Sequence, residues 1–336
     1  MPDHSDSAAL RIGVMGCGII AQTHLHASQN CPCIEITAAS SRSSSALAST
    51  SDECGIPNRF DDWRALIECR EVDAVLICLP DGLHEEATCQ AARCGKHVLV
   101  EKAMASSLAQ SQSMVQATNA AGVVLMVAQV VRQLPSHQLA KRLLHDGKIG
   151  SVEKATRRRL MEAAKVKPEL EKRPWIHDRG LCTDPLLFGF GSHEFDALLW
   201  LLGTEARTVQ ARGKWYADWS SWERIESSIS TRSGINVQVL LSLDANDAAW
   251  DTVIQGSDGT ITLFDDRVVV DDVETACPWT HDEVFAAQLN EFAICVRDGR
   301  EPGPSGRHVL PTMSVLGGVL ESLEQDVMIE LPIIES

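Results

Sequence analysis

The chain has 336 residues, of which 44% are apolar and 23% are charged, and its formal net charge at pH 7 is −16. This composition is typical of a globular protein of about two domains, and it argues against a disordered chain, a collagen-like fibre or a small disulfide scaffold. The acidic excess argues against nucleic acid or an anionic membrane surface as a partner, because both carry negative charge.

The targeting and cysteine signals indicate a reduced compartment. The first seven residues are polar and acidic, unlike a secretory signal, and the longest apolar stretch, residues 123–131, is too short to span a membrane. The cysteines number eleven and many lie inside apolar runs, as reduced thiols do. We therefore expect a cytoplasmic protein, and no spacing of His, Cys, Asp or Glu predicts a metal site.

Over roughly the first 125 residues, short apolar runs alternate with helical patterns. Continuous apolar strands separated by helices predict a doubly wound parallel sheet with helices on both faces. The strands are expected at residues 11–15, 34–39, 72–79, 97–100 and 123–128, and the helices at 19–28, 44–54, 62–68, 83–94 and 108–121.

After Gly150 the predicted strands become longer and alternate polar with apolar residues, which is typical of an antiparallel sheet. We therefore expect one domain over residues 1–150 and a second over 151–336. Helices are expected at 283–296 and at 310–323, the latter able to pack back on the first domain. The two halves carry net charges of −3 and −13, which favours a neutral substrate over a multiply phosphorylated one.

A glycine-rich turn, G-C-G-I-I-A, follows the first predicted strand and opens the first predicted helix. Gly16 permits a tight turn, and Gly18 lets the backbone approach a pyrophosphate. Ile19 and Ile20 begin the helix, whose N–H groups and dipole would face the phosphates. This context favours a dinucleotide site over an ordinary tight turn.

The end of the second predicted strand indicates which dinucleotide is bound. An Asp or Glu there would hydrogen-bond the ribose hydroxyls of NAD, but this chain has Ser41 and Arg42 instead. Hydroxyls and a guanidinium would bind a 2′-phosphate, so the sequence favours NADP over NAD. The alternative is that Arg42 is a solvated residue that stacks on adenine, which suits either cofactor.

Glu101 and Lys102 follow the predicted strand 97–100, and both are expected at the cofactor. In an open α/β sheet the carboxyl ends of the strands face the ligand crevice, so Lys102 would lie beside a nicotinamide ring and a substrate oxygen. The alternative is an ion pair between the two side chains at the surface.

At this point the sequence resembles the glucose–fructose oxidoreductase / inositol dehydrogenase (Gfo/Idh/MocA) family. The resemblance runs from Arg11 to about Pro332, and several motifs carry it in order. They are residues 16–21, 72–75, 80–84, 95–102, 147–150, 191–196 and 200–203.

The resemblance implies a Rossmann domain followed by an α/β domain with a large, mostly antiparallel open sheet, and a homodimer or homotetramer assembled through that sheet. It implies reversible hydride transfer between NAD(P) and a hydroxyl or keto carbon, usually of a sugar or cyclitol. The family's Glu-Lys-Pro and Asp-x-x-x-His patterns place the catalytic groups at Lys102 and His193. The lysine holds the substrate oxygen, and the histidine exchanges its proton. The alternative for His193 is a helix-terminal residue bonded to backbone.

This chain departs from the family pattern at two positions. Ala103 replaces the proline, a mild change if the residue lies in the first turn of a helix. Gly189 stands where the carboxylate four residues before His193 is expected, and Asp184 is the nearby carboxylate that could replace it.

Other residues are expected near the ligands on weaker grounds. His84 and Pro80 follow the third predicted strand near the cofactor, although His84 could equally cap or pack a helix. The remaining substrate-binding candidates are Arg132, Trp175, His177 and Asp196, and the alternative for Trp175 and His177 is an exposed polar loop without a ligand.

Two further functions stay open. One is a same-fold enzyme that uses bound NAD(P) for transient redox in elimination or glycoside cleavage. The other is a non-catalytic NAD(P)-binding sensor or assembly protein, which the glycine at position 189 supports.

Overall fold

The computed structural model describes residues 9–334, and the polar start of the chain lies outside this range. The described chain forms two compact units, each of which is described by itself. The first comprises residues 9–104, 110–130 and 280–308, and the second comprises 105–109, 131–279 and 309–334. No helix in the described part is long and apolar enough to cross a membrane.

The first unit contains a parallel sheet of six strands in the order β3-β2-β1-β4-β5-β6. Its inner strands are continuous apolar runs because helices cover both faces, and every residue of β4 is buried. This order reverses between β1 and β4, which is where open α/β sheets bind ligands. The strands are β1 (Leu10–Met15), β2 (Ile34–Ser40), β3 (Asn58–Phe60), β4 (Ala74–Ile77), β5 (His97–Val100) and β6 (Leu125–Val127).

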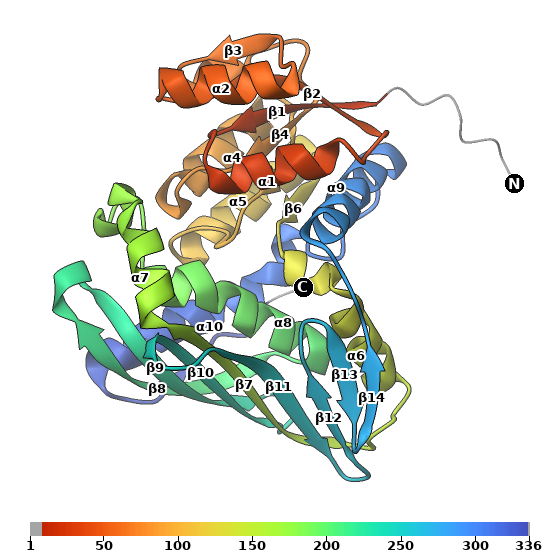
Figure 1. The fold of residues 1–336 in the computed structure, drawn as a ribbon, viewed down its shortest axis with the longest axis vertical. Helices are drawn as coiled ribbons and strands as arrows, with labels where there is room; N and C mark the ends of the chain where they lie inside the picture. The colour runs from red at the N-terminus through yellow and green to blue at the C-terminus, as the bar shows by residue number, and fades with distance from the viewer. Residues whose placement is uncertain (1–8, 335–336) are drawn as a thin grey trace, which may run out of the picture. The chain divides into compact units, whose positions relative to one another are not determined.

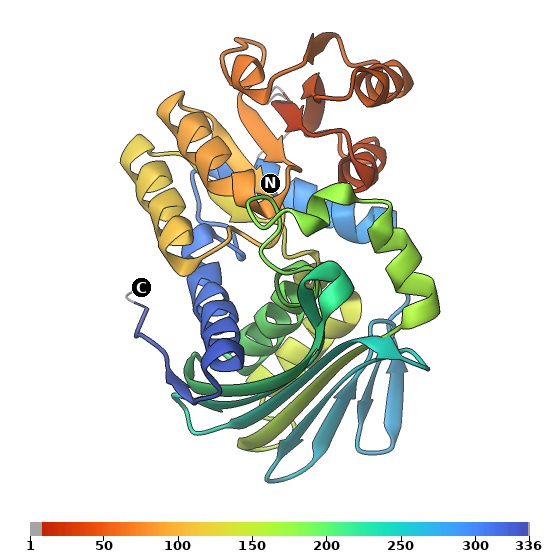
Figure 2. The ribbon, with the colours of Figure 1, turned by 90° about the vertical axis from the view of Figure 1, so that its left-hand side faces the viewer.

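Helices flank this sheet on its two sides (Figures 1 and 2). α1 packs with α9 against β2, and α3 packs with α4. The opposite placement of the two groups follows from right-handed crossovers that wind outward from β1 and β4. The helices are α1 (Ile19–Ser28), α2 (Ser44–Cys54), α3 (Trp63–Ile67), η1 (Asp81–Leu83), α4 (His84–Arg93), α5 (Leu108–Ala121) and α9 (His281–Asp298).

The compact units do not follow a single division at Gly150. Residues 131–150 lie in the second unit, and α9 lies in the first, where the Sγ of Cys31 is 3.6 Å from the carbonyl oxygen of Ala286. Most of α10 (Gly306–Gln325), which includes the predicted helix 310–323, lies in the second unit. There Thr312 Oγ1 donates to Asp196 Oδ1 at 3.2 Å. The functional division at Gly150, cofactor before and substrate after, stays a prediction.

The second unit contains a sheet of nine strands in the order β14-β13-β12-β11-β7-β10-β9-β8-β15. All of its strand pairs are antiparallel except that of β7 and β10. The strands are β7 (Val152–Glu162), β8 (Ala206–Tyr216), β9 (Ser221–Thr231), β10 (Asn236–Ala245), β11 (Ala249–Gly256), β12 (Thr260–Leu263), β13 (Arg267–Val270), β14 (Val273–Ala276) and β15 (Ile329–Glu330).

The helices of the second unit lie against one face of this sheet, and no described helix covers the other (Figures 1 and 2). The predicted fold class, a Rossmann parallel sheet followed by an α/β domain with a large, mostly antiparallel open sheet, is confirmed. The remaining helices are η2 (Val130–Gln133), α6 (Pro135–His145), α7 (Ala163–Glu171), η3 (Pro174–His177), the π-helix η4 (Pro185–Gly191), α8 (Ser192–Leu202) and η5 (Ala217–Trp219).

Candidate active site

The glycine-rich turn joins β1 to α1 at the point where the strand order reverses. Gly16 has φ +94°, and a Cβ there would lie 2.6 Å from the backbone oxygen of Cys78, so only glycine fits without strain. Its N–H donates to the carbonyl oxygen of Ser40 at 2.8 Å. The turn is thus packed against the ends of both neighbouring strands, β2 and β4.

Gly18 serves a different purpose from Gly16. Its φ of −81° is ordinary, and a Cβ there would meet no atom within 4 Å. Gly18 is the N-cap of α1, the helix has no side-chain cap and no acidic residue in its first turn, and Ile19 is 64% exposed. Open space in front of uncapped helix N–H groups fits the pyrophosphate of a dinucleotide. Ile20, the next residue, is half-buried.

The segment after β2 contains the residues predicted to choose the cofactor. Ser41 donates its N–H to Phe60 at 3.1 Å, and Arg42 is exposed. Ser43 then caps α2 by accepting a hydrogen bond from the N–H of Ala46 at 3.3 Å. Arg42 thus follows β2, which is the strand next to β1 in the sheet.

Glu101 and Lys102 follow β5, and Glu101 lies inside the protein and not at the surface. Glu101 is only 5% exposed, its Oε1 lies 2.7 Å from Nε2 of His24, and its Oε2 accepts the N–H of Lys102 at 3.1 Å. Burial alone would raise the pKa of the Glu101 carboxyl, but the hydrogen bond and charge of His24 and the charge of Lys102 outweigh it and lower the pKa. Both Glu101 oxygens thus bind protein groups, and the predicted contact of Glu101 with the cofactor stays a prediction.

His84 is also engaged by protein atoms. It is 1% exposed, with Nδ1 2.8 Å from the carbonyl oxygen of Ala103 and Nε2 2.8 Å from that of Leu79. This matches the packing alternative better than a cofactor contact, whereas Pro80 is half-exposed in the same loop. Ala103 is not in the first turn of a helix, since α5 begins five residues later, and the Lys102–Ala103 peptide bond is cis.

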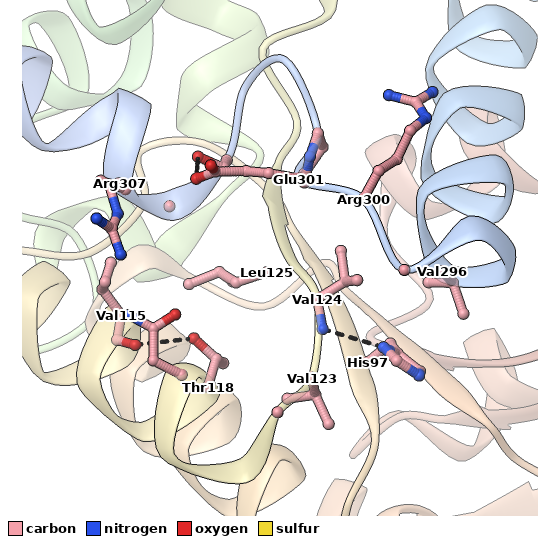
Figure 3. Close-up of a pocket in the computed structure, with 16 residues that line it drawn as sticks. His97, Val115, Thr118, Val123, Val124, Leu125, Val296, Arg300, Glu301 and Arg307 are labelled. Carbon is pink, nitrogen blue, oxygen red and sulfur yellow. Dashed lines mark hydrogen bonds between the residues drawn. The ribbon is translucent and has the colours of Figure 1, made fainter. Parts of the chain in front are cut away.

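A cavity of about 390 Å³ lies elsewhere in the first unit (Figure 3). It is lined by the start of β5 and the chain leading into β6, where Nδ1 of His97 accepts the N–H of Val124 at 3.0 Å. Because β5 begins at His97, this cavity lies at the amino ends of the parallel strands. The dinucleotide turn and Lys102 are at the carboxyl ends.

In the second unit, His193 is the second residue of α8, directly after the π-helix η4. Gly189 lies in η4, and a Cβ there would meet no atom within 4 Å. The position is therefore open to a side chain, and the chain places none there.

Asp184 does not replace the carboxylate expected at position 189. It is fully buried and caps η4, with Oδ1 accepting the N–H groups of Leu186 and Leu187 at 3.0 and 2.8 Å. Its Oδ2 accepts from Ser221 Oγ at 2.9 Å and from the N–H of Trp222 at 3.1 Å. Burial raises the pKa of Asp184 despite these hydrogen bonds. The structure thus corrects the expectation that Asp184 reaches a substrate, because both oxygens are saturated by protein donors.

Arg132 and Asp196, both predicted near the substrate, come together. Arg132 Nε and Nη2 donate to the two Asp196 oxygens at 2.7 Å each, and both residues are buried. Such a bidentate pair fixes both side chains. The other two candidates lie in η3, where Trp175 is half-exposed and His177 is exposed.

A buried charged cluster next to His193 was absent from the predicted site. Arg157 of β7 donates to Glu194 Oε2 at 2.5 Å and to Thr252 Oγ1 at 2.7 Å, and it lies 3.4 Å from Nε2 of His137. Burial, together with the charge of Arg157, lowers the pKa of His137 well below its ordinary value. The signal was the run of three arginines at 157–159, because side chains alternate along a strand and at least one must face inward.

The described residues contain no group of three or more His, Cys, Asp or Glu side chains that could hold a metal ion. The dinucleotide turn is therefore the feature of this site that fits a cofactor.

Comparison with known proteins places this geometry in a family. Residues 10–129 match a family described as "Oxidoreductase family, NAD-binding Rossmann fold", and residues 137–262 match the "GFO/IDH/MocA C-terminal domain". These matches confirm the predicted resemblance and a nicotinamide-dinucleotide cofactor.

Two curated relatives and one solved structure resemble almost the whole chain. A 4-carboxy-2-hydroxymuconate-6-semialdehyde dehydrogenase from Sphingobium sp. is 25% identical over 321 residues, covering 94% of this chain and 99% of the relative. A D-apiose dehydrogenase from Paraburkholderia graminis is 26% identical over 346 residues, covering 96% and 90%. An oxidoreductase domain protein from Kribbella flavida has a TM-score of 0.89 at 21% identity, covering 97% of this chain and 100% of that structure. The chain belongs to the Gfo/Idh/MocA family of oxidoreductases, whose N-terminal domain is an NAD-binding Rossmann fold.

Proposed function

We propose that this protein is an NAD(P)-dependent dehydrogenase or reductase that transfers hydride reversibly between nicotinamide and a hydroxyl or keto carbon of a sugar, cyclitol or related small molecule. The observation that carries the proposal is the dinucleotide turn, in which Gly16 packs on Cys78 while Gly18 leaves open space before the uncapped end of α1. The D-apiose dehydrogenase among the relatives supports a sugar substrate.

The residues of the first unit have separate tasks. Gly16, Gly18 and the N–H groups at the start of α1 would hold the pyrophosphate, and the bound cofactor supplies the hydride acceptor or donor. Lys102, at the carboxyl end of β5, holds the substrate oxygen through its ammonium group. Ser41 and Arg42 receive the adenosine ribose, and a 2′-phosphate on it gives NADP the preference over NAD.

His193 of the second unit takes the substrate hydroxyl proton when the alcohol is oxidised and returns it in the reverse direction. Imidazole suits this task because its unperturbed pKa lies near neutral pH. Arg132 of η2 and Asp196 of α8 bind each other through their polar atoms. We propose that they hold this part of the site in place and take no part in proton transfer. Trp175 and His177 are proposed to contact the substrate from η3.

Turnover measured with matched variants tests this assignment. Lys102→Ala and His193→Ala should each lower turnover at least about tenfold, because each removes a group that acts on the reacting oxygen. Lys165→Ala and His26→Ala, which alter exposed side chains with surface ion partners, are the controls. Full activity in both site variants would refute the assignment.

The empty position at Gly189 is the observation that favours a second candidate, a non-catalytic NAD(P)-binding sensor or assembly protein. Absorbance of reduced nicotinamide over a panel of sugars and cyclitols separates the functions. Net cofactor turnover supports the dehydrogenase. Tight cofactor binding without any reaction supports the non-catalytic sensor, and reduction of the cofactor without net consumption supports an enzyme that uses transient redox in elimination or glycoside cleavage.

We also propose a cytoplasmic homodimer or homotetramer that assembles through the uncovered face of the nine-stranded sheet. The eleven cysteines are all free thiols, which supports a reduced compartment. Ser228, Gln238, Thr156 and Val253 are successive cross-strand neighbours on that face, and each is at least partly exposed. Light scattering of the wild type and of Val253→Arg tests the assembly, and an unchanged mass for the variant would exclude this face.

A further inference from the structure

Two buried imidazoles reach the segment around Lys102 from different helices of the first unit. His24 belongs to α1, whose start is the dinucleotide turn, and its Nε2 lies 2.7 Å from Oε1 of Glu101. His84 begins α4, and its Nδ1 lies 2.8 Å from the carbonyl oxygen of Ala103. Each histidine is only 1% exposed. The residues on both sides of Lys102 are therefore held by groups inside the protein.

Glu101 connects His24 to the backbone of Lys102. Its Oε2 accepts the Lys102 N–H at 3.1 Å while its Oε1 faces the imidazole, so the carboxylate bridges α1 and the chain after β5. Its lowered pKa means that it stays ionised in the folded protein at neutral pH, which strengthens both hydrogen bonds. A change at His24 is thus transmitted to Lys102 through one side chain.

His84 holds the other side of the lysine. Both ring nitrogens lie 2.8 Å from carbonyl oxygens, those of Ala103 and Leu79. A neutral imidazole has a single N–H and donates to one carbonyl at a time, whereas an imidazolium donates to both. The ring thus lies between the chain after β4 and the chain after β5, with one nitrogen facing each.

Stability alone does not explain this arrangement. A buried carboxylate needs partners to offset its desolvation, and apolar side chains of similar volume are often as stabilising. His24 Nδ1 is moreover buried without a hydrogen-bond partner among the described residues, which is unfavourable for folding. The hydrogen bonds of these buried side chains end on the backbone of Lys102 and Ala103. This is where a flexible lysine must be positioned for chemistry.

We propose that His24, Glu101 and His84 are positioning residues that fix the backbone on either side of Lys102. This role rests on the proposed function in one respect only, which is that Lys102 acts on a substrate. None of the three needs to touch substrate. Removing one should loosen the lysine while leaving the dinucleotide turn, formed by Gly16 and Gly18, in place.

The first experiment compares His24→Leu with His24→Gln, since the glutamine amide can place a donor near the lost Nε2 and leucine cannot. We expect His24→Leu to lower kcat by at least about tenfold, with KM and the Kd for NADP changed by less than about threefold. His24→Gln should recover most of kcat. The control is His26→Leu on the same helix, whose imidazole is 65% exposed. A kcat that falls only in proportion to the folded fraction, or an equal loss of NADP affinity, would overturn the proposal.

The second experiment reads Lys102 without any substrate. Reductive methylation with ¹³C-formaldehyde labels the lysines, and the signal missing from Lys102→Arg identifies Lys102 in the NMR spectrum. We expect this signal to shift or broaden in His24→Leu and to return toward its wild-type position in His24→Gln. An unchanged signal in His24→Leu would refute the positioning role even if kcat falls.

The two readouts separate the two proposals. If the wild-type protein turns over no substrate, the proposed function fails, but the Lys102 signal still decides whether the buried groups hold this residue. If His24→Leu does not fold, Glu101→Gln replaces it in both experiments and is compared with the wild type. This change keeps the shape of the side chain and removes its charge.

Discussion

In the first unit the buried carboxylate of Glu101 meets an imidazole and a backbone N–H, whereas in the second unit the buried carboxylates of Glu194 and Asp196 meet arginine guanidinium groups. The first arrangement holds a loop at the end of a strand. The second joins α8 to β7 and to η2 by side chain–side chain pairs. Buried charge therefore places backbone beside the proposed chemistry in one unit and ties a helix to its surroundings in the other.

This difference predicts different consequences of mutation. Breaking a buried ion pair between elements leaves an unpaired charge in the interior, and the effect should appear in the free energy of unfolding. Altering exposed residues near the ends of the parallel strands, such as Gly18 and Arg42, should affect cofactor affinity more than stability. The predictions below test this contrast, beginning with the largest expected effect.

Arg157→Leu should lower the free energy of unfolding by about 3–5 kcal/mol, because it leaves the buried Glu194 carboxylate without its main partner. The matched control is Arg158→Leu, the next residue of β7, whose side chain is 45% exposed and pairs with Asp251. A surface pair of this kind contributes only about 0–1 kcal/mol. Urea unfolding of both variants measures the difference, and equal losses would show that burial of the pair does not matter.

The two glycines of the dinucleotide turn should respond differently to substitution. Gly16→Ala forces a Cβ against the backbone oxygen of Cys78 at a φ of +94°, and should destabilise the protein by about 1–3 kcal/mol. Gly18→Ser adds a helix-capping hydroxyl in open space, so stability should be kept or slightly increased while cofactor binding weakens. Thermal unfolding and NADP titration of each variant test this. Unweakened NADP binding by Gly18→Ser would contradict a pyrophosphate at α1.

The pH dependence of stability should also differ between the units. The pKa of His137 is depressed in the folded protein, so below about pH 6.5 the unfolded chain binds a proton that the native state does not. Stability conferred by neutral His137 is complete above that pH and is lost as the pH falls toward the folded pKa, by up to about 1.4 kcal/mol per pH unit.

Glu101 gives a lower window. Its folded pKa is also depressed, so its contribution to stability is present above the ordinary carboxyl value of about 4.3 and is lost as the pH falls through the folded pKa.

Urea unfolding between about pH 7.5 and 5.5 tests the His137 prediction and should show a smaller loss of stability for His137→Phe than for the wild type. Parallel pH curves for the two proteins would show that His137 is not the group that titrates.

The first unit could be predicted closely because its signals are local. The helix predicted at 44–54 coincides with α2, since Ser43 caps its start and Gly55, at φ +65°, ends it. The apolar runs give the inner strands directly. By contrast β3 has only three residues and no apolar run, so nothing in its sequence marks it as a strand.

The second unit and the site depend on contacts that are distant in the sequence. Alternating residues predict strands, but not that β10 pairs in parallel with β7 or that β15 pairs with β8. The cluster around Arg157 gathers residues from separate elements, with Glu194 37 positions away. The sequence alone suggests that Asp184 binds substrate, because the residue type is the same whether a buried aspartate caps a helix or binds a ligand. Only the donors around it distinguish the two roles.

The smallest expected effect concerns the choice of cofactor. Arg42→Ala should weaken NADP binding about tenfold more than NAD binding, because a guanidinium contact to the 2′-phosphate exists only with NADP. Arg93→Ala, an exposed arginine at the end of α4, is the control. Ser41→Asp should add to the discrimination in favour of NAD, since a carboxylate repels the 2′-phosphate and can bind the ribose hydroxyls. Equal weakening of both cofactors by Arg42→Ala would mean that the arginine stacks on adenine, and the preference would then have to arise elsewhere in the first unit.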